Sequence, residues 1–195
     1  PLQIGIESVS EDALRDMNTL QNAPQSAVEA VGRIQAHGIV VLAHMIIGAD
    51  SDGPEAFDRT LEFVEQANVV HHICHPLNAP PGTKVWYDLR RQGRVLDPAG
   101  AEIEEYLSLI DVVTNIVPKK MTRVELMRGL ADYWERVNDP DHYLKRAMGF
   151  IRGIERKPRV KNPGLRAAWD KRTLMKDMFA FFMRRAPKDQ RKVFL

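Results

Sequence analysis

The nine residues Ile39-Val40-Val41-Leu42-Ala43-His44-Met45-Ile46-Ile47 decide the fold class of this 195-residue chain. Eight of the nine are apolar, so polar residues do not alternate with apolar ones. Such a run is typical of a strand that is buried on both faces, because a half-exposed strand shows polar residues at every second position. The run is less than half as long as the roughly 20 residues that a membrane-spanning helix needs. It therefore predicts a strand covered by helices on both sides or closed in a barrel.

Two further strands are predicted, one on each side of this run in the sequence. Leu2–Glu7 is the first strand, and the stretch from Val69 to His75 is the third. A helical pattern that begins at Pro24 separates the first two strands, and another that begins at Pro54 separates the second from the third. Strands that alternate with helices form βαβ units, in which the strands are parallel and the connections right-handed. The predicted fold class is therefore α/β.

The chain after the third strand is predicted to be mainly helical. A short amphipathic helix is expected over Lys84–Arg91, and its inward residues would be Val85, Trp86 and Leu89. Thr122-Arg123-Val124-Glu125 forms a capping box, in which a hydroxyl and a carboxylate satisfy the first amide groups of a helix. Another helix is predicted to begin at Asp139-Pro140. Its apolar positions are Tyr143, Leu144, Ala147, Phe150 and Ile151.

Charge divides the chain into two parts. Residues 1–155 carry 15 lysines and arginines against 23 aspartates and glutamates, a net charge of −8. Residues 156–195 carry 13 against 3, a net charge of +10. A basic segment of this kind binds nucleic acid or anionic lipid, or docks on an acidic surface such as residues 1–155 would supply. The change from strand–helix alternation to a helical pattern and this change in charge together divide the chain into three parts. They are an α/β part over 1–96, a helical domain over 97–156, and a basic linker, helix and tail over 157–195.

Cys74 is the only cysteine of the chain. An intramolecular disulfide is therefore impossible, and a reducing, cytoplasmic setting is expected. A cysteine-ligated iron–sulfur cluster cannot be built from this chain alone either, since such clusters take several thiolate ligands. We expect neither a signal peptide nor a transmembrane segment, because no basic and apolar leader and no sufficiently long apolar run occurs.

The three predicted strands each end in residues that suit ligand binding. Glu7 and Ser8 follow the first strand, Ile46 and Gly48 end the second, and the loop 77–83 follows the third. Ligands bind outside the carboxyl ends of the strands in an open parallel sheet, so these residues would line one site. A carboxylate such as Glu7 accepts hydrogen bonds from two vicinal hydroxyls, as in ribose, and Gly48 lets a flat ligand approach the backbone.

Each of these features also has an explanation without a ligand. Glu7 could cap a loop or the following helix, and Ile46-Ile47-Gly48 could be a core strand followed by a turn glycine. The loop Leu77-Asn78-Ala79-Pro80-Pro81-Gly82-Thr83 either presents backbone groups to the edge of an adenine or is rigid without any ligand. The residues alone leave both interpretations open.

His71, His72, Cys74 and His75 suggest a metal site in the third strand. In a strand, however, His71 and His75 face one side, and His72 and Cys74 face the other. A closed zinc site needs four ligands, so at least two would have to come from elsewhere. One alternative is therefore a fragment of another (β/α)-barrel or Rossmann-like enzyme, with His44, His71 and His75 near a metal or phosphate. A second alternative is a module that binds nucleic acid through the basic tail.

Several segments, taken in order, resemble the second half of a radical S-adenosylmethionine (SAM) enzyme. They are Ile4-Gly5-Ile6-Glu7-Ser8, Gln21-Asn22, His37-Gly38-Ile39, Met45–Asp52, Phe57-Asp58, Leu77–Thr83 and Gly93-Arg94-Val95-Leu96. More narrowly, they are similar to the cobalamin-binding subgroup that includes the hopanoid methylases. Asn115–Met121, Tyr133 and Asp139–Tyr143 resemble the helical domain that follows the radical core in this subgroup. The resemblance covers roughly residues 2–155.

The resemblance implies an α/β fold that is the second half of a partial (β/α)6 barrel, with three parallel βα units and a mainly helical C-terminal region after them. It also implies a SAM-binding site with Glu7 and Ser8 near the ribose and methionyl part, Ile46 and Gly48 at the adenine, and Leu77 and Asn78 at its edge. The sequence departs from the family pattern at His44, which stands where the second strand usually has its first glycine.

The same resemblance implies the cofactors and partners of the intact enzyme. That enzyme would cleave SAM reductively and methylate a small-molecule or lipid substrate with the help of cobalamin. The family's three-cysteine cluster motif is not found here, so the iron–sulfur cluster and cobalamin are expected only in the intact protein. An N-terminal half of the barrel would complete the sheet, and nucleic acid is not expected as a partner. We expect the chain alone to be inactive and to bind SAM weakly or not at all.

Overall fold

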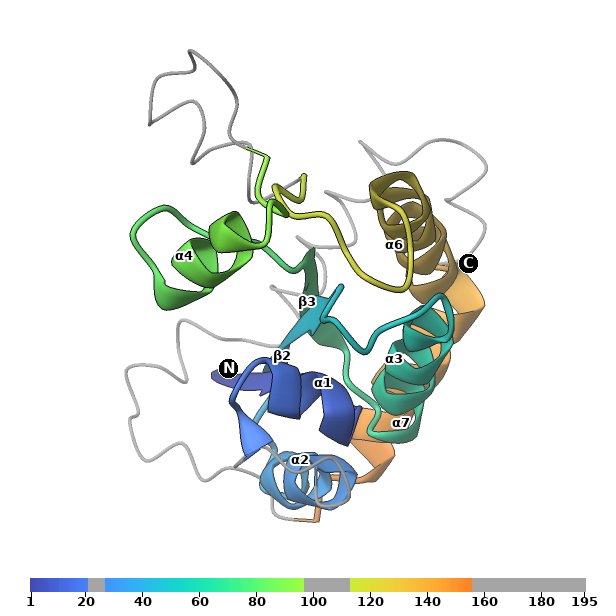
Figure 1. Ribbon diagram of the computed structural model, residues 1–195. Coiled ribbons are helices and arrows are strands. Elements are labelled where there is room, and N and C mark those ends of the chain that lie inside the picture. Colours follow the sequence, from blue (N-terminus) through green and yellow to red (C-terminus); the bar gives the residue numbers. More distant parts are fainter. Residues whose placement is uncertain (21–26, 97–112, 156–195) are drawn as a thin grey trace, which may run out of the picture. The chain divides into compact units, whose positions relative to one another are not determined.

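The structure is a computed structural model, and it describes residues 1–20, 27–96 and 113–155 (Figure 1). These residues belong to one unit, Pro1–Arg156, and Lys157–Leu195 form a second unit. Three of the predictions fall on residues outside the described ranges. They concern the helix start at Pro24, the first part of the helical domain over 97–112, and the basic linker, helix and tail over 157–195.

A three-stranded parallel sheet in the order β1-β2-β3 lies at the centre of the first unit. The strands are β1 (Leu2–Glu7), β2 (Val41–Ile47) and β3 (His71–Pro76). The chain returns between them through the helices α1 (Glu11–Asp16) and α2 (Ala27–Ala36), and then through α3 (Glu55–Gln66). Leu2 lies opposite Val41 in the register, and Leu42 lies opposite His71. The predicted α/β class with parallel βα units is confirmed.

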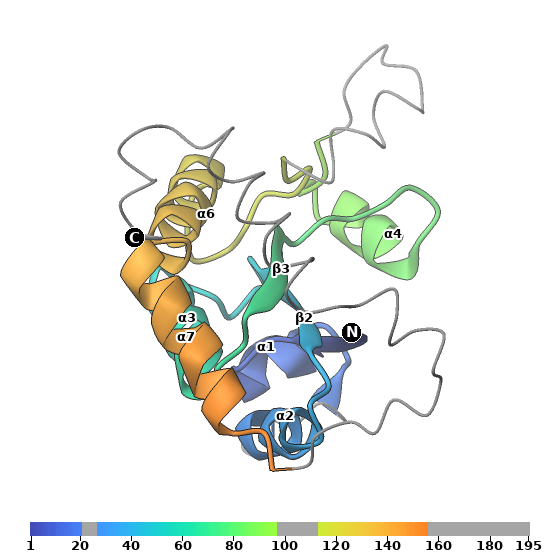
Figure 2. The ribbon, with the colours of Figure 1, turned by 180° about the vertical axis from the view of Figure 1, so that it is seen from behind.

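The two faces of the sheet differ in how they are covered. One face packs against α2, α3 and α6 (Arg123–Val137). Figures 1 and 2 show α3, α6 and α7 (Pro140–Arg152) together on one side of the sheet, and α4 (Lys84–Arg91) on the other side. On β2, the residues buried under the helices are Val41, Ala43, Met45 and Ile47, and the partly exposed residues of the opposite face are Leu42, His44 and Ile46. The run was predicted to be covered by helices on both sides or closed in a barrel, and within the described ranges helices fully cover one face of β2.

Helices α3 and α6 approach each other closely on the covered face. α3 buries Phe57, Leu61 and Val64. Gly129 of α6 lies against the ring of Phe57, and a Cβ at this position would collide with the ring. Glycine inside a helix lowers stability relative to alanine, so the close helix contact explains why glycine stands here.

The predicted capping box begins α6. The Thr122 hydroxyl accepts from the Glu125 amide at 3.1 Å, and the Glu125 carboxylate accepts from the Thr122 amide at 2.7 Å. Two amide groups at the helix start are therefore satisfied by side chains. The helix then buries Leu126, Leu130, Tyr133 and Val137, which recur at helical spacing.

α4 has its predicted bounds, but one of its predicted inward residues points outward. The Thr83 hydroxyl caps the helix by accepting from the Trp86 amide at 3.3 Å. Leu89 is buried, and Trp86 packs against a small apolar cluster that includes Ile116. Val85 is 37% exposed. The prediction that Val85 points inward is wrong, because Val85 packs in neither of the two apolar clusters of the described residues.

α7 begins where predicted, with Asp139 as its N-cap and Pro140 in its first turn. Three of its predicted apolar positions, Tyr143, Leu144 and Ile151, are exposed. The buried residue of α7 is instead Arg146, whose guanidinium donates to the carbonyls of Val69 at 3.1 Å and Val137 at 2.6 Å. This arginine therefore joins α7 to the ends of α6 and of the loop before β3.

Candidate functional site

The carboxyl ends of the three strands enclose a cavity of about 380 Å³. Its lining residues are Gly5, Glu7, His44, Met45, Ile46, His75, Pro76, Leu77 and Asn78. Four of the six predicted site residues, Glu7, Ile46, Leu77 and Asn78, are therefore brought together in one cavity. The other two, Ser8 and Gly48, are not among its lining residues.

Glu7 occupies an unusual backbone position at the tip of β1. Its φ angle is +64°, in the left-handed region that residues other than glycine rarely adopt. The register with β2 shifts between Gly5 and Glu7, as in a β-bulge, which redirects a side chain. The redirected carboxylate lies over Gly5, and a Cβ at Gly5 would collide with it. No hydrogen bond or ion pair holds the Glu7 carboxylate within the described ranges, so it remains open to a ligand in the cavity.

Ser8 supports the loop that follows β1. Its side chain is buried, and its Oγ accepts from the Ser10 amide at 3.1 Å. Ser10 in turn caps α1 by accepting from the Ala13 amide at 3.4 Å. In this arrangement Ser8 orients the chain between β1 and α1, and a contact between Ser8 and a ligand stays a prediction.

Gly48 is fixed by its backbone angle and by a neighbouring helix. Its φ angle is +114°, and a Cβ here would lie 3.0 Å from Cδ2 of Leu126 in α6. The amides of Gly48 and Ala49 donate to the Asp52 carboxylate at 3.0 and 3.1 Å. Burial raises the pKa of Asp52, and these two amides counteract that effect. Gly48 is thus required by the turn itself, and close approach of a ligand at this residue stays a prediction.

The loop after β3 is held by residues from much later in the chain. Ala79 donates its amide to Oδ1 of Asn115 at 2.9 Å and accepts from Nδ2 of the same side chain at 2.8 Å. The Thr114 hydroxyl donates to the Leu77 carbonyl at 2.7 Å. The amide of Ala79 is therefore engaged internally, and Leu77 and Asn78 are the residues of this loop that line the cavity. The Asn78 side chain donates to the Pro76 carbonyl at 3.3 Å and accepts from the Asn115 amide at 3.0 Å.

Three lining residues follow from strand alternation and were not among the predicted site residues. Gly5, His44 and His75 lie on the half-open face of the sheet, where Gly5 is opposite His44 and His75 is opposite Ile46. Because parallel partners share a face, the pairing of the strands brings both histidines to the same wall of the cavity. Thr114 carried no comparable signal, and Asn115 was noted only as the first residue of the segment Asn115–Met121 that resembles the family's helical domain.

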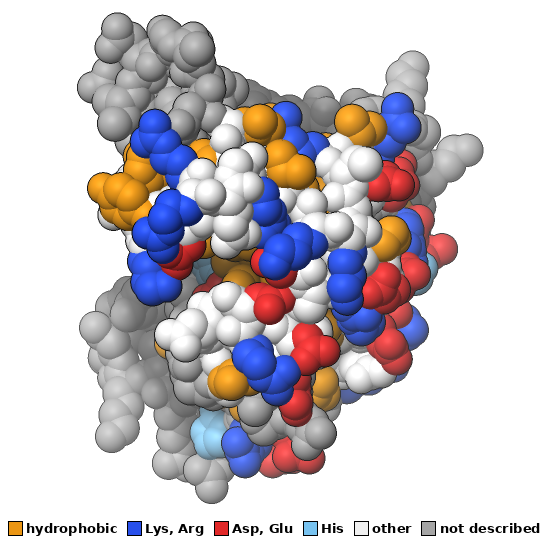
Figure 3. All heavy atoms as spheres, viewed as in Figure 1, with side chains coloured by type: hydrophobic (Ala, Val, Ile, Leu, Met, Phe, Trp, Pro, Cys, Tyr) orange, Lys and Arg blue, Asp and Glu red, His pale blue; other side chains and the backbone are white. Residues whose placement is uncertain are grey.

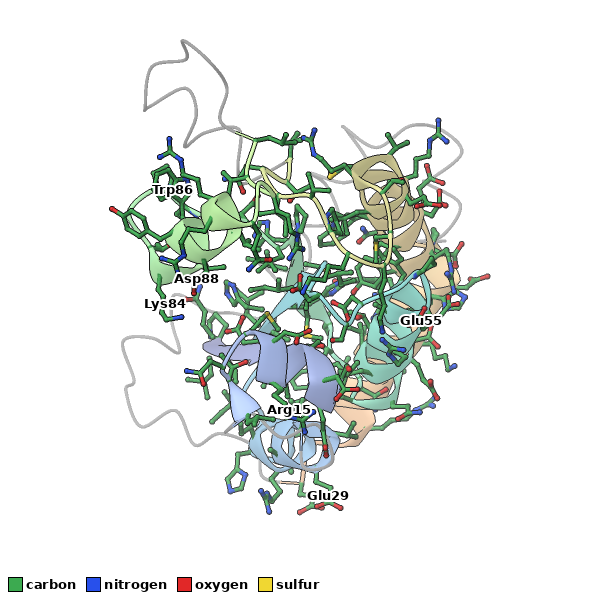
Figure 4. The ribbon with its side chains drawn as sticks, in the orientation of Figure 1. Arg15, Glu29, Glu55, Lys84, Trp86 and Asp88 are labelled. Carbon is green, nitrogen blue, oxygen red and sulfur yellow. The ribbon has the colours of Figure 1, made fainter. Side chains whose placement is uncertain are left out.

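A second cavity of about 420 Å³ adjoins the first and shares Leu77 with it. Figure 3 shows this hollow between the surfaces of α1 and α4, with hydrophobic side chains in its depth. Lys84 and Asp88 form an ion pair of 2.6 Å on α4, and Figure 4 shows both on the edge of α4 that faces α1. The rim of this hollow is therefore polar, and its depth is apolar.

The histidines and Cys74 form no metal site in the described part of the chain, where no group of three or more His, Cys, Asp or Glu side chains is arranged to hold a metal ion. His72 stacks on Trp134 at 5.1 Å between ring centres and meets Tyr133 edge-on. Burial, with a contribution from nearby Arg146, lowers the pKa of His72 to about 4. Burial raises the pKa of Cys74 to about 12, so its thiol stays protonated and is a poor metal ligand.

A family model described as a domain of unknown function (DUF4070) matches residues 83–194. This range begins at Thr83, which is the last residue of the loop 77–83 and the N-cap of α4. It includes Thr114 and Asn115 as well as α6 and α7.

Three curated relatives are methylating enzymes by name. The chain is 29% identical over 143 residues to an uncharacterized methyltransferase, sll1242, of Synechocystis sp., which is 73% of this chain and 26% of that protein. It is 33% identical over 93 residues to the hopanoid C-2 methylase of Rhodopseudomonas palustris, 48% of this chain and 18% of that protein. It is 24% identical over 148 residues to the bacteriochlorophyllide d C-12(1)-methyltransferase of Chlorobaculum tepidum, 76% of this chain and 31% of that protein. The chain thus spans less than a third of the length of each relative.

Proposed function

Because this chain belongs to the DUF4070 family, whose domain is found in cobalamin-binding radical SAM methylases, we propose that its three strand ends form one wall of a SAM-binding site. The observation that carries this proposal is the convergence of Glu7, Ile46, Leu77 and Asn78 on one cavity. Its volume of about 380 Å³ lies in the usual range of small-molecule pockets. Ligands of parallel sheets bind at this edge.

The chemistry of the lining residues suits the parts of SAM. The open carboxylate of Glu7 accepts hydrogen bonds, as the ribose hydroxyls or the methionyl ammonium group require. Ile46 and Leu77 offer apolar surface to the adenine ring, and the Asn78 amide lies at the edge of that surface. Ser8 and Gly48 belong to the proposed site as supports of the loops that follow β1 and β2.

The residues of this chain do not fit an iron–sulfur cluster. Cys74 is buried on the helix-covered face of the sheet, away from the cavity, and burial raises the pKa of its thiol to about 12. Ligands for a cluster, and a site for cobalamin, are therefore assigned to the intact enzyme and not to this chain. Bound SAM supplies a methyl group or, after reductive cleavage, a radical, and the residues of this chain bind and orient it.

We further propose that the intact enzyme methylates a small molecule or a lipid in the cytoplasm. The names of two relatives point to this substrate class, since one is a hopanoid methylase and one a bacteriochlorophyllide methyltransferase. The outer edge of β1 would pair with a further strand, because β1 has a neighbour only in β2 within the described sheet. In the described part of the chain, no helix has the length and apolar character needed to cross a membrane.

NMR of the chain with ¹³C-labelled isoleucine and leucine methyl groups tests the proposed SAM site. On titration with SAM, the signals of Ile46 and Leu77 should shift, with a Kd of about 1–10 mM, which corresponds to roughly −3 to −4 kcal/mol. Glu7→Gln should weaken these shifts, since it removes the charge and one acceptor. Glu11→Gln, at an exposed residue of α1, is the matched control and should leave them unchanged. Shifts that are absent at the highest SAM concentration, or that spare the cavity, would contradict the proposal.

A further inference from the structure

The loop that forms one side of the cavity lies before the DUF4070 match, but the residues that hold it lie inside the match. The Thr114 hydroxyl donates to the Leu77 carbonyl at 2.7 Å, and the Asn115 amide donates to Oδ1 of Asn78 at 3.0 Å. The Asn115 side chain pairs with both backbone groups of Ala79, at 2.9 and 2.8 Å. Four hydrogen bonds thus connect two consecutive residues to three consecutive residues that lie 36 or 37 positions earlier in the sequence.

Two of these hydrogen bonds, those between Asn115 and Ala79, are buried, and the two to Leu77 and Asn78 are partly buried. Thr114 is 1% exposed, Asn115 is 5% exposed, and Ala79 is fully buried. A buried backbone group that loses its partner destabilises the fold, so the loop cannot leave Thr114 and Asn115 without a penalty. The orientation of the Asn115 amide is defined, because its oxygen faces a donor and its nitrogen faces an acceptor.

The position of Thr114 is secured in turn by α6. The Arg123 guanidinium donates to the Thr114 carbonyl at 2.8 Å, and the Thr114 hydroxyl also accepts from the Ile116 amide at 3.2 Å. The DUF4070 region also holds the loop after β2, because Lys119 pairs with Asp50 at 2.5 Å and Lys120 donates to the Ser51 carbonyl at 3.0 Å. The ends of β2 and β3, which carry the apolar lining residues Ile46 and Leu77, are therefore both contacted by this region.

We propose that Thr114 and Asn115 are positioning residues, which hold Leu77 and Asn78 in the place where the cavity needs them. One role of the DUF4070 region is then to set the geometry of a SAM site whose contacts come from the preceding sheet. This inference rests on the proposed function for the identity of the ligand, but its geometric part does not. Neither residue lines the cavity, so neither is assigned a contact with SAM.

A pair of isosteric variants separates positioning from general stability. Thr114→Val removes the hydroxyl that bonds Leu77 and keeps the shape of the side chain. Thr60→Val is the matched control, because the buried Thr60 hydroxyl donates to the Ala56 carbonyl at 2.8 Å inside α3, away from the cavity. Thr114→Ser keeps the hydroxyl and should restore the wild-type behaviour.

The first measurement needs no ligand. In Thr114→Val the methyl signals of Leu77 and the side-chain amide signals of Asn78 should shift, and in Thr60→Val and Thr114→Ser they should stay at their wild-type positions. Unchanged signals of both residues in Thr114→Val would overturn the proposal, whether or not SAM binds. Equal shifts of both residues in Thr60→Val would also overturn it, since they would indicate a general loss of order.

The second measurement is the SAM titration of the same variants. Thr114→Val should weaken binding about 5-fold, as expected for the loss of one hydrogen bond in the support of the wall, and Thr114→Ser should recover it. Wild-type affinity in Thr114→Val would overturn the positioning role and leave the proposed SAM site intact. If the wild-type chain itself does not bind SAM, the proposed function fails, and the first measurement alone decides the geometric inference.

Discussion

At the scale of single residues, Gly5 and Glu7 depend on each other, because the missing side chain of Gly5 leaves space for the Glu7 carboxylate. The carboxylate of Glu7 lies over the bare Cα of Gly5, and the left-handed backbone of Glu7 brings it there. Such backbone angles cost of the order of 1 kcal/mol or more in residues other than glycine, and they are retained where the surrounding structure fixes them. The arrangement holds an acidic group at the wall of the cavity, directly over the backbone of β1.

Gly5→Ala tests this dependence without removing the carboxylate. The new Cβ would collide with the Glu7 side chain and displace it, so the SAM-induced shifts of Ile46 and Leu77 should fall as they do in Glu7→Gln. Gly32→Ala in α2 is the control, because a Cβ there meets nothing within 4 Å and should stabilise the helix by about 0.5–1 kcal/mol. If the SAM-induced shifts of Ile46 and Leu77 are undiminished in Gly5→Ala, the position of the Glu7 carboxylate does not matter for SAM binding.

The sequence allowed part of the site to be predicted, and the missing part has a physical cause. Glu7, Ile46 and the loop 77–83 were predicted because the ends of parallel strands meet at one edge, a rule that needs only the order of the elements. Within that loop, Leu77 and Asn78 were singled out by the family resemblance. The supporting role of Asn115 was not found, because its partner Ala79 is determined by tertiary packing of two loops. A site that depends on contacts between distant loops cannot be read from local patterns alone.

At the scale of elements, local signals predicted where helices begin better than which face they bury. The capping box at Thr122 and the N-cap at Asp139 lie where predicted, since both depend on neighbouring residues only. The buried face of α7 was not predictable, because Arg146 is drawn inward by two carbonyls, those of Val69 and Val137, that come from other elements.

The contact between β3 and α6 makes stability depend on pH. Burial lowers the pKa of His72 from 6.5 to about 4, so the folded chain holds this histidine neutral while the unfolded chain protonates it below pH 6.5. This contribution to stability is fully present above pH 6.5 and is lost as the pH falls toward 4. From pH 7.5 to pH 5 the free energy of unfolding should fall by about 2 kcal/mol on this account.

Urea denaturation at a series of pH values measures this effect, with two histidine variants as reference. His72→Gln should lose much of the pH dependence below pH 6.5, because the titrating group is gone. His71→Gln, on the same strand but exposed on the opposite face, should keep it. A wild-type pH profile in His72→Gln would refute the assignment to this residue.

At the scale of the whole molecule, the proposed function assigns the binding of a cofactor to this chain and the chemistry performed on that cofactor to the rest of the intact enzyme. The strand ends and the loop after β3 supply the lining of the cavity. Residues of the DUF4070 region contact the loops that follow β2 and β3, through Leu126 at Gly48, Lys119 at Asp50 and Asn115 at Ala79. Residues 1–155 carry a net charge of −8, but Glu7 is the only carboxylate among the cavity-lining residues that the structure describes. The lining is therefore suited to a ligand that is largely apolar or carries positive charge, as the sulfonium and ammonium groups of SAM do.

This separation predicts that the chain alone does not cleave SAM. Its only thiol, Cys74, is buried on the helix-covered face, and its raised pKa of about 12 keeps it protonated at neutral pH. After treatment with iron, sulfide and reductant, the chain should show neither the absorbance of a four-iron cluster nor release of 5′-deoxyadenosine from SAM. Cys74→Ala identifies adventitious iron, since any absorbance that persists in this variant cannot come from a cysteine ligand. Formation of 5′-deoxyadenosine by the wild-type chain, lost in Cys74→Ala, would show that the metal chemistry resides in these 195 residues.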